Sequence, residues 1–175
     1  EDADALAGLG YVAQRNGNYA AAADYLDRAA KQGGENSQQR MTQAADARFY
    51  AQLATAQQAM KAGNTAQALS LSEPLTQADG EKGVSAKLFR ADVQRRSNQF
   101  DAAEQTYRSV IQSDPDNRAA KEGLFYVLRQ QKRGAEANTL LSSLPESVRE
   151  SVTPKPAVTS DPVRRQAKQA LAAGN

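Results

Sequence analysis

Apolar residues recur every three or four positions along most of this chain, which predicts a succession of amphipathic helices. The clearest example lies in residues 84–117, where one apolar stripe precedes a polar turn at residues 97–99 and a second stripe follows it. The two stripes contain Leu88, Ala91, Val93, Ala103, Tyr107, Val110 and Ile111. The second helix should stop at residues 114–117, because Pro115 disfavours helical backbone in the residue before it. Residues 84–117 therefore read as one helix–turn–helix unit.

The same unit recurs along the chain at a nearly constant spacing. Equivalent turns fall at Gly17, Gly63, Asn98 and Lys132, so successive turns are 46, 35 and 34 residues apart. A unit of about 34 residues with alanine, aromatic and terminal proline positions is typical of the tetratricopeptide repeat. We therefore predict an all-α fold, a right-handed superhelical solenoid of antiparallel helix pairs in which each repeat contacts only its neighbours.

Unequal spacing predicts where the array is irregular. Four repeats are expected, at residues 3–35, 48–82, 84–117 and 118–150. The long first interval leaves residues 36–47 as a polar non-repeat insertion, which we expect to extend the following helix towards Ser37. Inside the second repeat, Pro74 removes a backbone hydrogen bond, so its helix should bend or stop near Ser72 and Glu73.

The C-terminal part departs from the repeat pattern and then resumes it. Residues 151–162 contain three prolines and no helical stripe, so an extended linker is expected there. Residues 163–175 are again helical in pattern and end in Gly174-Asn175, a dipeptide that also occurs at residues 17–18 and 63–64. We expect them to form the first helix of a truncated further repeat. The chain also opens without a signal-peptide pattern, and we expect it to be a segment of a longer protein.

Composition argues against several classes of function. The chain has no cysteine and no histidine, which removes thiol chemistry, Ser-His catalysis and the usual zinc ligands. Its 22 basic and 20 acidic residues nearly balance, which argues against a nucleic-acid partner. Acidic pairs such as Asp24 with Asp27 are typical of a solvated surface, and no apolar run is long enough to cross a membrane. We expect no enzymatic activity, no cofactor and no bound metal.

The first helices of the repeats carry the candidate binding residues. In tetratricopeptide arrays these helices line the concave surface, where side chains that point away from their own helix pair are available to a ligand. Counting along each first helix gives Tyr11, Gln14, Arg15, Tyr50, Gln57, Lys61, Asp92, Arg95, Arg96, Tyr126, Arg129 and Gln130. Tyrosine rings mixed with arginine and amide side chains suit an acidic or extended peptide, or a sugar polymer. The alternative is that some of these tyrosines only pack between repeats.

Five stretches of the chain resemble one particular family beyond the generic repeat. They are spread from end to end, at residues 5–29, 46–64, 86–97, 122–133 and 161–175. These stretches are similar to the periplasmic repeat region of bacterial cellulose synthase operon protein C. Members of that family are secreted, carry a long tetratricopeptide array in the periplasm and end in an outer-membrane β-barrel through which the glucan leaves. The resemblance implies a periplasmic location for this segment.

The same resemblance implies a non-enzymatic scaffold of cellulose synthesis and export. Its partners would be proteins of the cellulose synthase complex, with the glucan chain as a lesser expectation. Two alternatives stay open, a repeat module of another exopolysaccharide exporter and a generic peptide-binding adaptor. The candidate residues favour a protein partner with acidic groups, because one acid, Asp92, stands against the cations Arg15, Lys61, Arg95, Arg96 and Arg129.

Overall fold

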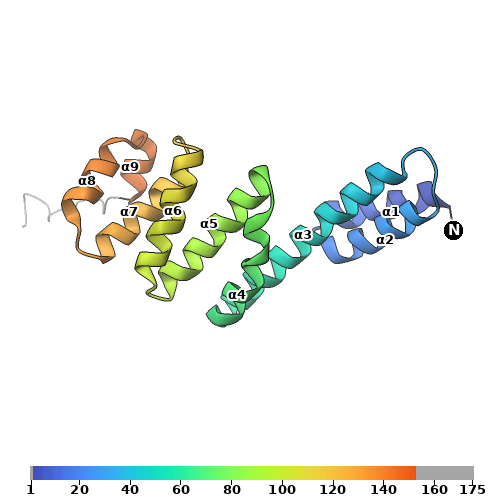
Figure 1. The fold of residues 1–175 in the computed structure, drawn as a ribbon, viewed down its shortest axis with the longest axis horizontal. Helices are drawn as coiled ribbons and strands as arrows, with labels where there is room; N and C mark the ends of the chain where they lie inside the picture. The colour runs from blue at the N-terminus through green and yellow to red at the C-terminus, as the bar shows by residue number, and fades with distance from the viewer. Residues whose placement is uncertain (1, 153–175) are drawn as a thin grey trace, which may run out of the picture.

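The computed structural model describes residues 2–152, which form a row of helices with no strand among them. These elements are α1 (Ala3–Arg15), α2 (Tyr19–Lys31), α3 (Ser37–Lys61), α4 (Thr65–Ser72), the 3-10 helix η1 (Pro74–Gln77), α5 (Gly80–Arg96), α6 (Phe100–Ser113), α7 (Arg118–Gln130), α8 (Gly134–Ser142) and α9 (Glu146–Val152). Within this part of the chain, extensive contacts join only elements that are consecutive or next but one in order. The array is therefore elongated (Figure 1), and the predicted all-α solenoid is confirmed for the described residues.

Four turns share one backbone geometry and set the register of the helix pairs. The second residue after each first helix has a left-handed backbone, with φ of 74° at Gly17, 79° at Gly63, 60° at Asn98 and 62° at Lys132. In all four turns the residue after the left-handed one donates a backbone hydrogen bond of 2.9 Å to the carbonyl oxygen of the residue five positions before itself. A left-handed residue in this place lets the chain satisfy the last carbonyls of the helix. The four turns therefore mark equivalent positions along the array.

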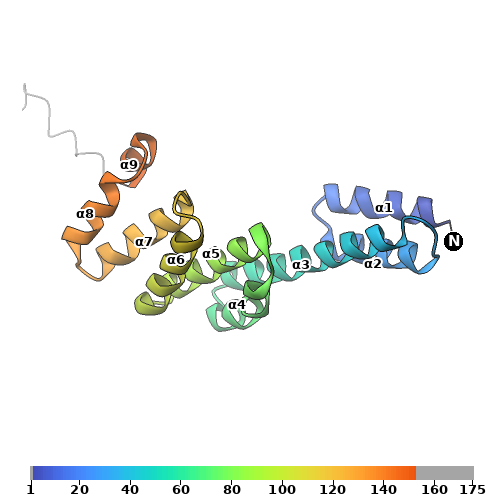
Figure 2. The ribbon, with the colours of Figure 1, turned by 45° about the horizontal axis from the view of Figure 1, so that its top comes forward.

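The insertion makes α3 much longer than the other first helices and gives it two sets of neighbours. α3 begins at Ser37, as the polar extension predicted, and runs for 25 residues. Its N-terminal half packs against α2 through Ala44 and Ala47, which are fully buried. Its C-terminal half packs against η1, α4 and α5 through Leu53 and Ala59. Both views show α3 bridging the α1–α2 pair and the remaining helices (Figure 1 and Figure 2).

Pro74 ends α4 early and turns the chain into α5. α4 stops at Ser72, as the proline predicted, and Pro74–Gln77 continue as η1. α5 then begins at Gly80, four residues before the predicted start at Val84. Gly83 permits this early start, because a β-carbon there would lie 1.8 Å from the carbonyl oxygen of Ala78. The predicted start was wrong because glycine normally weakens a helix, whereas here it allows a close backbone approach.

A short helix that the sequence did not predict completes the described part. α9 follows Pro145, whose carbonyl oxygen accepts the backbone amide of Val148 at 2.9 Å. Val148 and Val152 are 0% and 7% exposed, and they join the core formed by α5 to α8. The linker expected from Ser151 therefore does not begin before residue 153. Residues 153–162 of that linker, and the further repeat expected at 163–175, lie outside the described residues.

Candidate functional site

Because the turns are equivalent, the first helices can be compared position by position. Eleven of the twelve predicted residues occupy three equivalent positions, and all of them are exposed or partly exposed. Six residues before the left-handed turn residue stand Tyr11, Gln57, Asp92 and Tyr126. Three residues before it stand Gln14, Arg95 and Arg129. Two residues before it stand Arg15, Lys61, Arg96 and Gln130. We call the surface formed by these eleven residues the first-helix face.

At the middle of the first-helix face, Asp92 holds two arginines. Its carboxylate pairs with the guanidinium of Arg95 and accepts a hydrogen bond of 3.1 Å from Nε of Arg96. The Arg95 guanidinium also lies 5.6 Å from the ring centre of Tyr126, which belongs to α7. That distance is within the range of a cation–π contact. The structure thus gathers four predicted residues from two helices, and we call them the Asp92 cluster.

A cleft of about 240 Å³ opens beside the Asp92 cluster and is reached by α5, α6 and α7. It is lined by Leu88, Asp92, Arg95, Tyr107, Ala119, Glu122, Gly123 and Tyr126. Burial, helped by the charge of Asp92, raises the pKa of the Tyr107 hydroxyl to about 12. This hydroxyl therefore stays neutral at ordinary pH and can take part in hydrogen bonds.

Arg95 brings a cation to the wall of this cleft. Burial works to lower the pKa of Arg95, but the hydrogen bond and the charge of Asp92 raise it overall. The Nε atom of Arg95 is buried and has no hydrogen-bond partner among the described residues. A buried donor without a partner is uncommon in folded proteins. Arg95 is thus held at the wall of the cleft by Asp92, with its Nε atom covered by the protein.

Cations without an acidic partner stand elsewhere on the first-helix face. Arg15, Lys61 and Arg129 are exposed and form no ion pair within residues 2–152. Arg129 only lies near the Phe125 ring, 6.0 Å from its centre. Around Arg95 the positive charge is partly neutralised, because Arg95 and Arg96 share Asp92 and because Glu122 lines the same cleft.

Two of the predicted tyrosines contact helices of the N-terminal half. Tyr11 donates a hydrogen bond of 3.0 Å to Oε1 of Gln43 on α3, although 45% of its surface stays exposed. Tyr50, the one predicted residue outside the three positions, is partly buried. Its ring centre lies 5.4 Å from that of Tyr19 on α2. Tyr126 is thus part of the Asp92 cluster, while Tyr11 and Tyr50 take part in packing between helices.

Several polar contacts between helices were missed by the sequence analysis. Arg40 of α3 is only 6% exposed and pairs with Asp4 of α1. Lys82 of α5 pairs with Asp46 of α3, and the hydrogen bond to Asp46 raises the pKa of Lys82. Each pair joins residues 36 positions apart, so no short motif reveals it. These contacts tie α3 to the helices on both sides of it.

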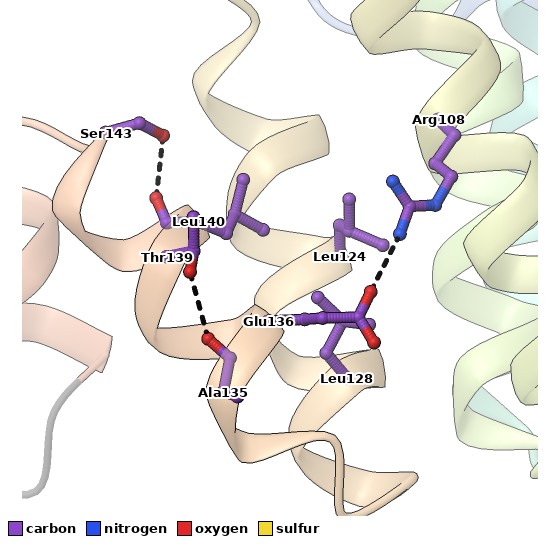
Figure 3. Close-up of a pocket in the computed structure, with 8 residues that line it drawn as sticks. All are labelled: Arg108, Leu124, Leu128, Ala135, Glu136, Thr139, Leu140 and Ser143. Carbon is purple, nitrogen blue, oxygen red and sulfur yellow. Dashed lines mark hydrogen bonds and ion pairs between the residues drawn. The ribbon is translucent and has the colours of Figure 1, made fainter.

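A larger cleft, of about 470 Å³, lies between α6, α7 and α8 (Figure 3). Leu124, Leu128 and Leu140 supply its apolar lining. Arg108 of α6 faces Glu136 of α8 across it, with 3.7 Å between Arg108 Nη2 and Glu136 Oε2. This cleft contains none of the twelve predicted residues.

Residues 2–152 hold no group of three or more acidic side chains placed to bind a metal ion. No helix in that range combines the length and the apolarity that crossing a bilayer requires. The side chains gathered on the first-helix face are of the kind that recognise ligands by charge, hydrogen bonds and ring contacts.

Comparison with known proteins agrees with the repeat geometry. Two family models, both described as tetratricopeptide repeat, match the chain. One covers residues 1–39 and 53–118, and the other covers residues 94–153. The interval between 39 and 53 falls within α3 and contains most of the insertion. No solved structure matches the chain at a significant level.

Three curated bacterial proteins are similar to most of this chain. Cellulose synthase 1 operon protein C of Komagataeibacter xylinus is 35% identical over 141 residues, which are 81% of this chain and 11% of that protein. Cellulose synthase operon protein C of Pseudomonas fluorescens (strain SBW25) is 33% identical over 157 residues, 87% of this chain and 12% of that protein. The protein of the same name from Xanthomonas axonopodis pv. citri (strain 306) is 32% identical over 176 residues, 99% of this chain and 11% of that protein.

Proposed function

The chain belongs to the tetratricopeptide repeat family, and we propose that it is a non-enzymatic scaffold module of bacterial cellulose synthesis and export. Its role in this proposal is to hold a protein of the cellulose synthase complex on the first-helix face. The proposal includes a periplasmic location, upstream of an outer-membrane exporter barrel, which rests on the family resemblance. The chain spans 11 to 12% of the length of the curated relatives it matches, so the activity of the whole protein belongs to the same proposal.

The first-helix face carries the proposal, through its unpaired cations and through the cleft beside the Asp92 cluster. The cleft combines the guanidinium of Arg95, the neutral hydroxyl of Tyr107 and the ring of Tyr126. An extended peptide offers matching groups, since its carbonyl oxygens accept hydrogen bonds and a side chain can enter the cleft. At about 240 Å³, the cleft is smaller than the ~300–1,000 Å³ of most cofactor and small-molecule sites. It therefore suits a single anchoring side chain.

The unpaired cations of the first-helix face favour an acidic partner. Arg15, Lys61 and Arg129 have no neutralising carboxylate in the described part of the chain. An acidic segment gains association rate and specificity from such charges, and this gain weakens as salt screens them. Neutral glucan gains little from them. Contact of the glucan with the exposed tyrosines is accordingly the lesser candidate.

The two alternative assignments use the same face with different partners. A module of another exopolysaccharide exporter would bind proteins of that export system, and a generic adaptor would bind peptides with no link to polysaccharide. The identities to three cellulose synthase operon proteins favour the cellulose system over both. Loss of cellulose output from a variant of this face would separate the first assignment from the two alternatives.

The test replaces two of the unpaired cations by glutamate. In a cellulose-secreting bacterium that makes the full-length protein, Lys61→Glu combined with Arg129→Glu is expected to reduce cellulose output several-fold without reducing the amount of protein. Arg118→Glu is the matched control, because Arg118 is exposed on α7 but lies outside the first-helix face. Normal output from the double variant would contradict the proposal. An equal loss in the control variant would also count against it.

A further inference from the structure

A cleft with an uncharged lining opens between the α1–α2 turn and α3. Its volume is about 270 Å³, and its lining is Gly17, Asn18, Tyr19, Ala20, Ala51, Gln52, Ala54, Thr55 and Gln58. Both clefts described above contain acidic and basic side chains. This one presents three amides, one threonine hydroxyl and a tyrosine instead. We call it the neutral cleft.

The insertion creates the neutral cleft by shifting α2 along α3. In α7, Leu124 and Val127 pack into the core that includes α6, and they are 3% and 0% exposed. The equivalent positions of α3, eight and five residues before the left-handed turn residue, are Thr55 and Gln58. Both are exposed, because α2 packs against the N-terminal half of α3 instead. Two positions that are apolar and covered in α7 are thus polar and open in α3.

An aromatic pair stands beside these polar groups. Tyr19, the first residue of α2, lines the neutral cleft and is partly exposed. Its ring lies 5.4 Å from that of Tyr50, at an interplanar angle of 34°. Tyr50 in turn makes an edge contact with Phe49 at 5.3 Å, and Phe49 is buried in the core of α3, η1 and α5. The core therefore holds the Tyr19 ring through Tyr50, and a fixed ring is a suitable surface for a flat apolar ligand face.

The polar groups of the neutral cleft keep free hydrogen-bonding capacity. The Oδ1 atom of Asn18 accepts the Ala21 amide at 3.2 Å, which leaves the two amide protons of Asn18 available. The Thr55 hydroxyl donates to the Ala51 carbonyl at 2.9 Å and can still accept. Gln52 and Gln58 are exposed, and their side chains form no hydrogen bond within the described part of the chain. The cleft thus offers both donors and acceptors.

We propose that the neutral cleft binds a short stretch of a neutral glucose polymer. A glucopyranose ring has apolar faces made of axial C–H groups, one of which can pack on Tyr19. Its rim of hydroxyl groups both donates and accepts, which the amides and Thr55 match. A neutral ligand that displaced water from a charged lining would leave those charges buried without a partner, which costs free energy. An uncharged lining avoids that cost. The volume of about 270 Å³ is slightly below the ~300 Å³ at which most small-molecule sites begin, so the cleft suits a single sugar unit of the polymer. The identification of the sugar as glucose rests on the proposed function.

The experiment is a titration of the 175-residue chain, labelled with ¹⁵N, with cellohexaose, followed by amide chemical shifts. We expect shifts that saturate at residues lining the neutral cleft, above all Asn18, Thr55 and Gln58. Combining Gln52→Ala with Gln58→Ala should weaken the affinity about tenfold or more, and so should Tyr19→Ala. A charged polysaccharide, polygalacturonate, should produce no shifts at these residues.

Gln39→Ala is the matched control, because Gln39 is an exposed glutamine of α3 that lies outside both the neutral cleft and the first-helix face. It should bind cellohexaose as the unmodified chain does. The proposal is overturned if the shifts are absent at ~10 mM cellohexaose, if they fall outside the neutral cleft, or if Gln39→Ala weakens binding as much as the double variant of Gln52 and Gln58. Binding to the protein partner through Lys61 and Arg129 is a separate measurement, so either proposal can fail without the other.

Discussion

Gly123 of α7 lies directly against the ring of Tyr107 of α6, and a β-carbon at position 123 would stand 2.3 Å from Cζ of that ring. The contact brings two helices together beside the Asp92 cluster, where only a hydrogen fits between backbone and ring. Gly123→Ala should therefore lower the free energy of unfolding by about 1–3 kcal/mol, because the buried ring must move. Gly134→Ala is the control, since a β-carbon there meets nothing within 4 Å. Chemical denaturation measures both, and equal stabilities of the two variants would refute the close contact.

Burial of Tyr107 predicts a loss of stability in alkali. The pKa of its hydroxyl is raised from an unfolded value of about 10 to about 12 in the folded chain. The unfolded state therefore loses this proton first, so the contribution is constant below about pH 10 and falls as the pH rises from about 10 to 12. The slope due to this group cannot exceed about 1.4 kcal/mol per pH unit.

Tyr107→Phe removes the titrating hydroxyl and isolates this contribution from the other tyrosines. Unfolding free energies of the two proteins should run in parallel up to about pH 10 and then converge or cross as the unmodified chain loses stability faster. Parallel curves up to pH 12 would mean that Tyr107 titrates normally.

The contact between Glu104 of α6 and Arg133, the residue before α8, predicts sensitivity to acid. Arg133 donates to Glu104 at 2.5 Å and to both carboxylate oxygens of Glu136 at 2.7 Å. Burial would raise the pKa of Glu104, but hydrogen bonds from Arg133 and Arg108 lower it overall. The folded pKa lies below the unfolded value of about 4.3, so this stability is present above that pH and is lost as the pH falls through the folded pKa.

Glu104→Gln should remove this acid-dependent contribution, at a cost of about 1 kcal/mol at neutral pH. The stability difference between the two proteins should shrink as the pH falls from about 5 towards 3, as followed by urea denaturation. A difference that is independent of pH would show that the carboxylate charge contributes nothing.

The left-handed turn residues predict two opposite effects on stability. Gly63 has φ of 79° and open space around it, so Gly63→Ala should destabilise through backbone strain alone, by about 1–2 kcal/mol. Lys132 already has a side chain at φ of 62°, so Lys132→Gly should stabilise by up to about 1 kcal/mol. Thermal unfolding of both variants tests the pair, and a destabilised Lys132→Gly would mean that this side chain has a stabilising contact.

Local patterns predicted the helices and turns of this chain well. Pro74 marked the end of α4, and the turn at Lys132 was found from spacing although no glycine occurs there. α9 was missed because its apolar stripe is only Val148 and Val152, too short a run to show a helical period. The start of α5 was missed because the fit of Gly83 under Ala78 depends on the path of η1.

The candidate site was predictable only where its residues are close in sequence. The spacing of Asp92, Arg95 and Arg96 by three and four positions allows their pairing on one helix face to be read directly. The approach of Arg95 to Tyr126 and the burial of Arg40 beside Asp4 depend on how separate helices pack. The neutral cleft depends on the displacement of α2 along α3. The length of the insertion alone did not specify that displacement, so the cleft could not be predicted.

The measurement that most directly tests the central claim is the affinity of the 175-residue chain for purified cellulose synthase complex, determined by surface plasmon resonance at salt concentrations from ~50 to ~300 mM. We predict binding that weakens as salt rises, and a loss of about tenfold or more at low salt when Lys61 and Arg129 are both changed to Glu. Arg118→Glu should bind like the unmodified chain. Binding that survives the double reversal, fails when Tyr11 and Tyr126 are truncated to Ala and is displaced by cello-oligosaccharides would contradict the claim, since the ligand of the first-helix face would then be the polymer.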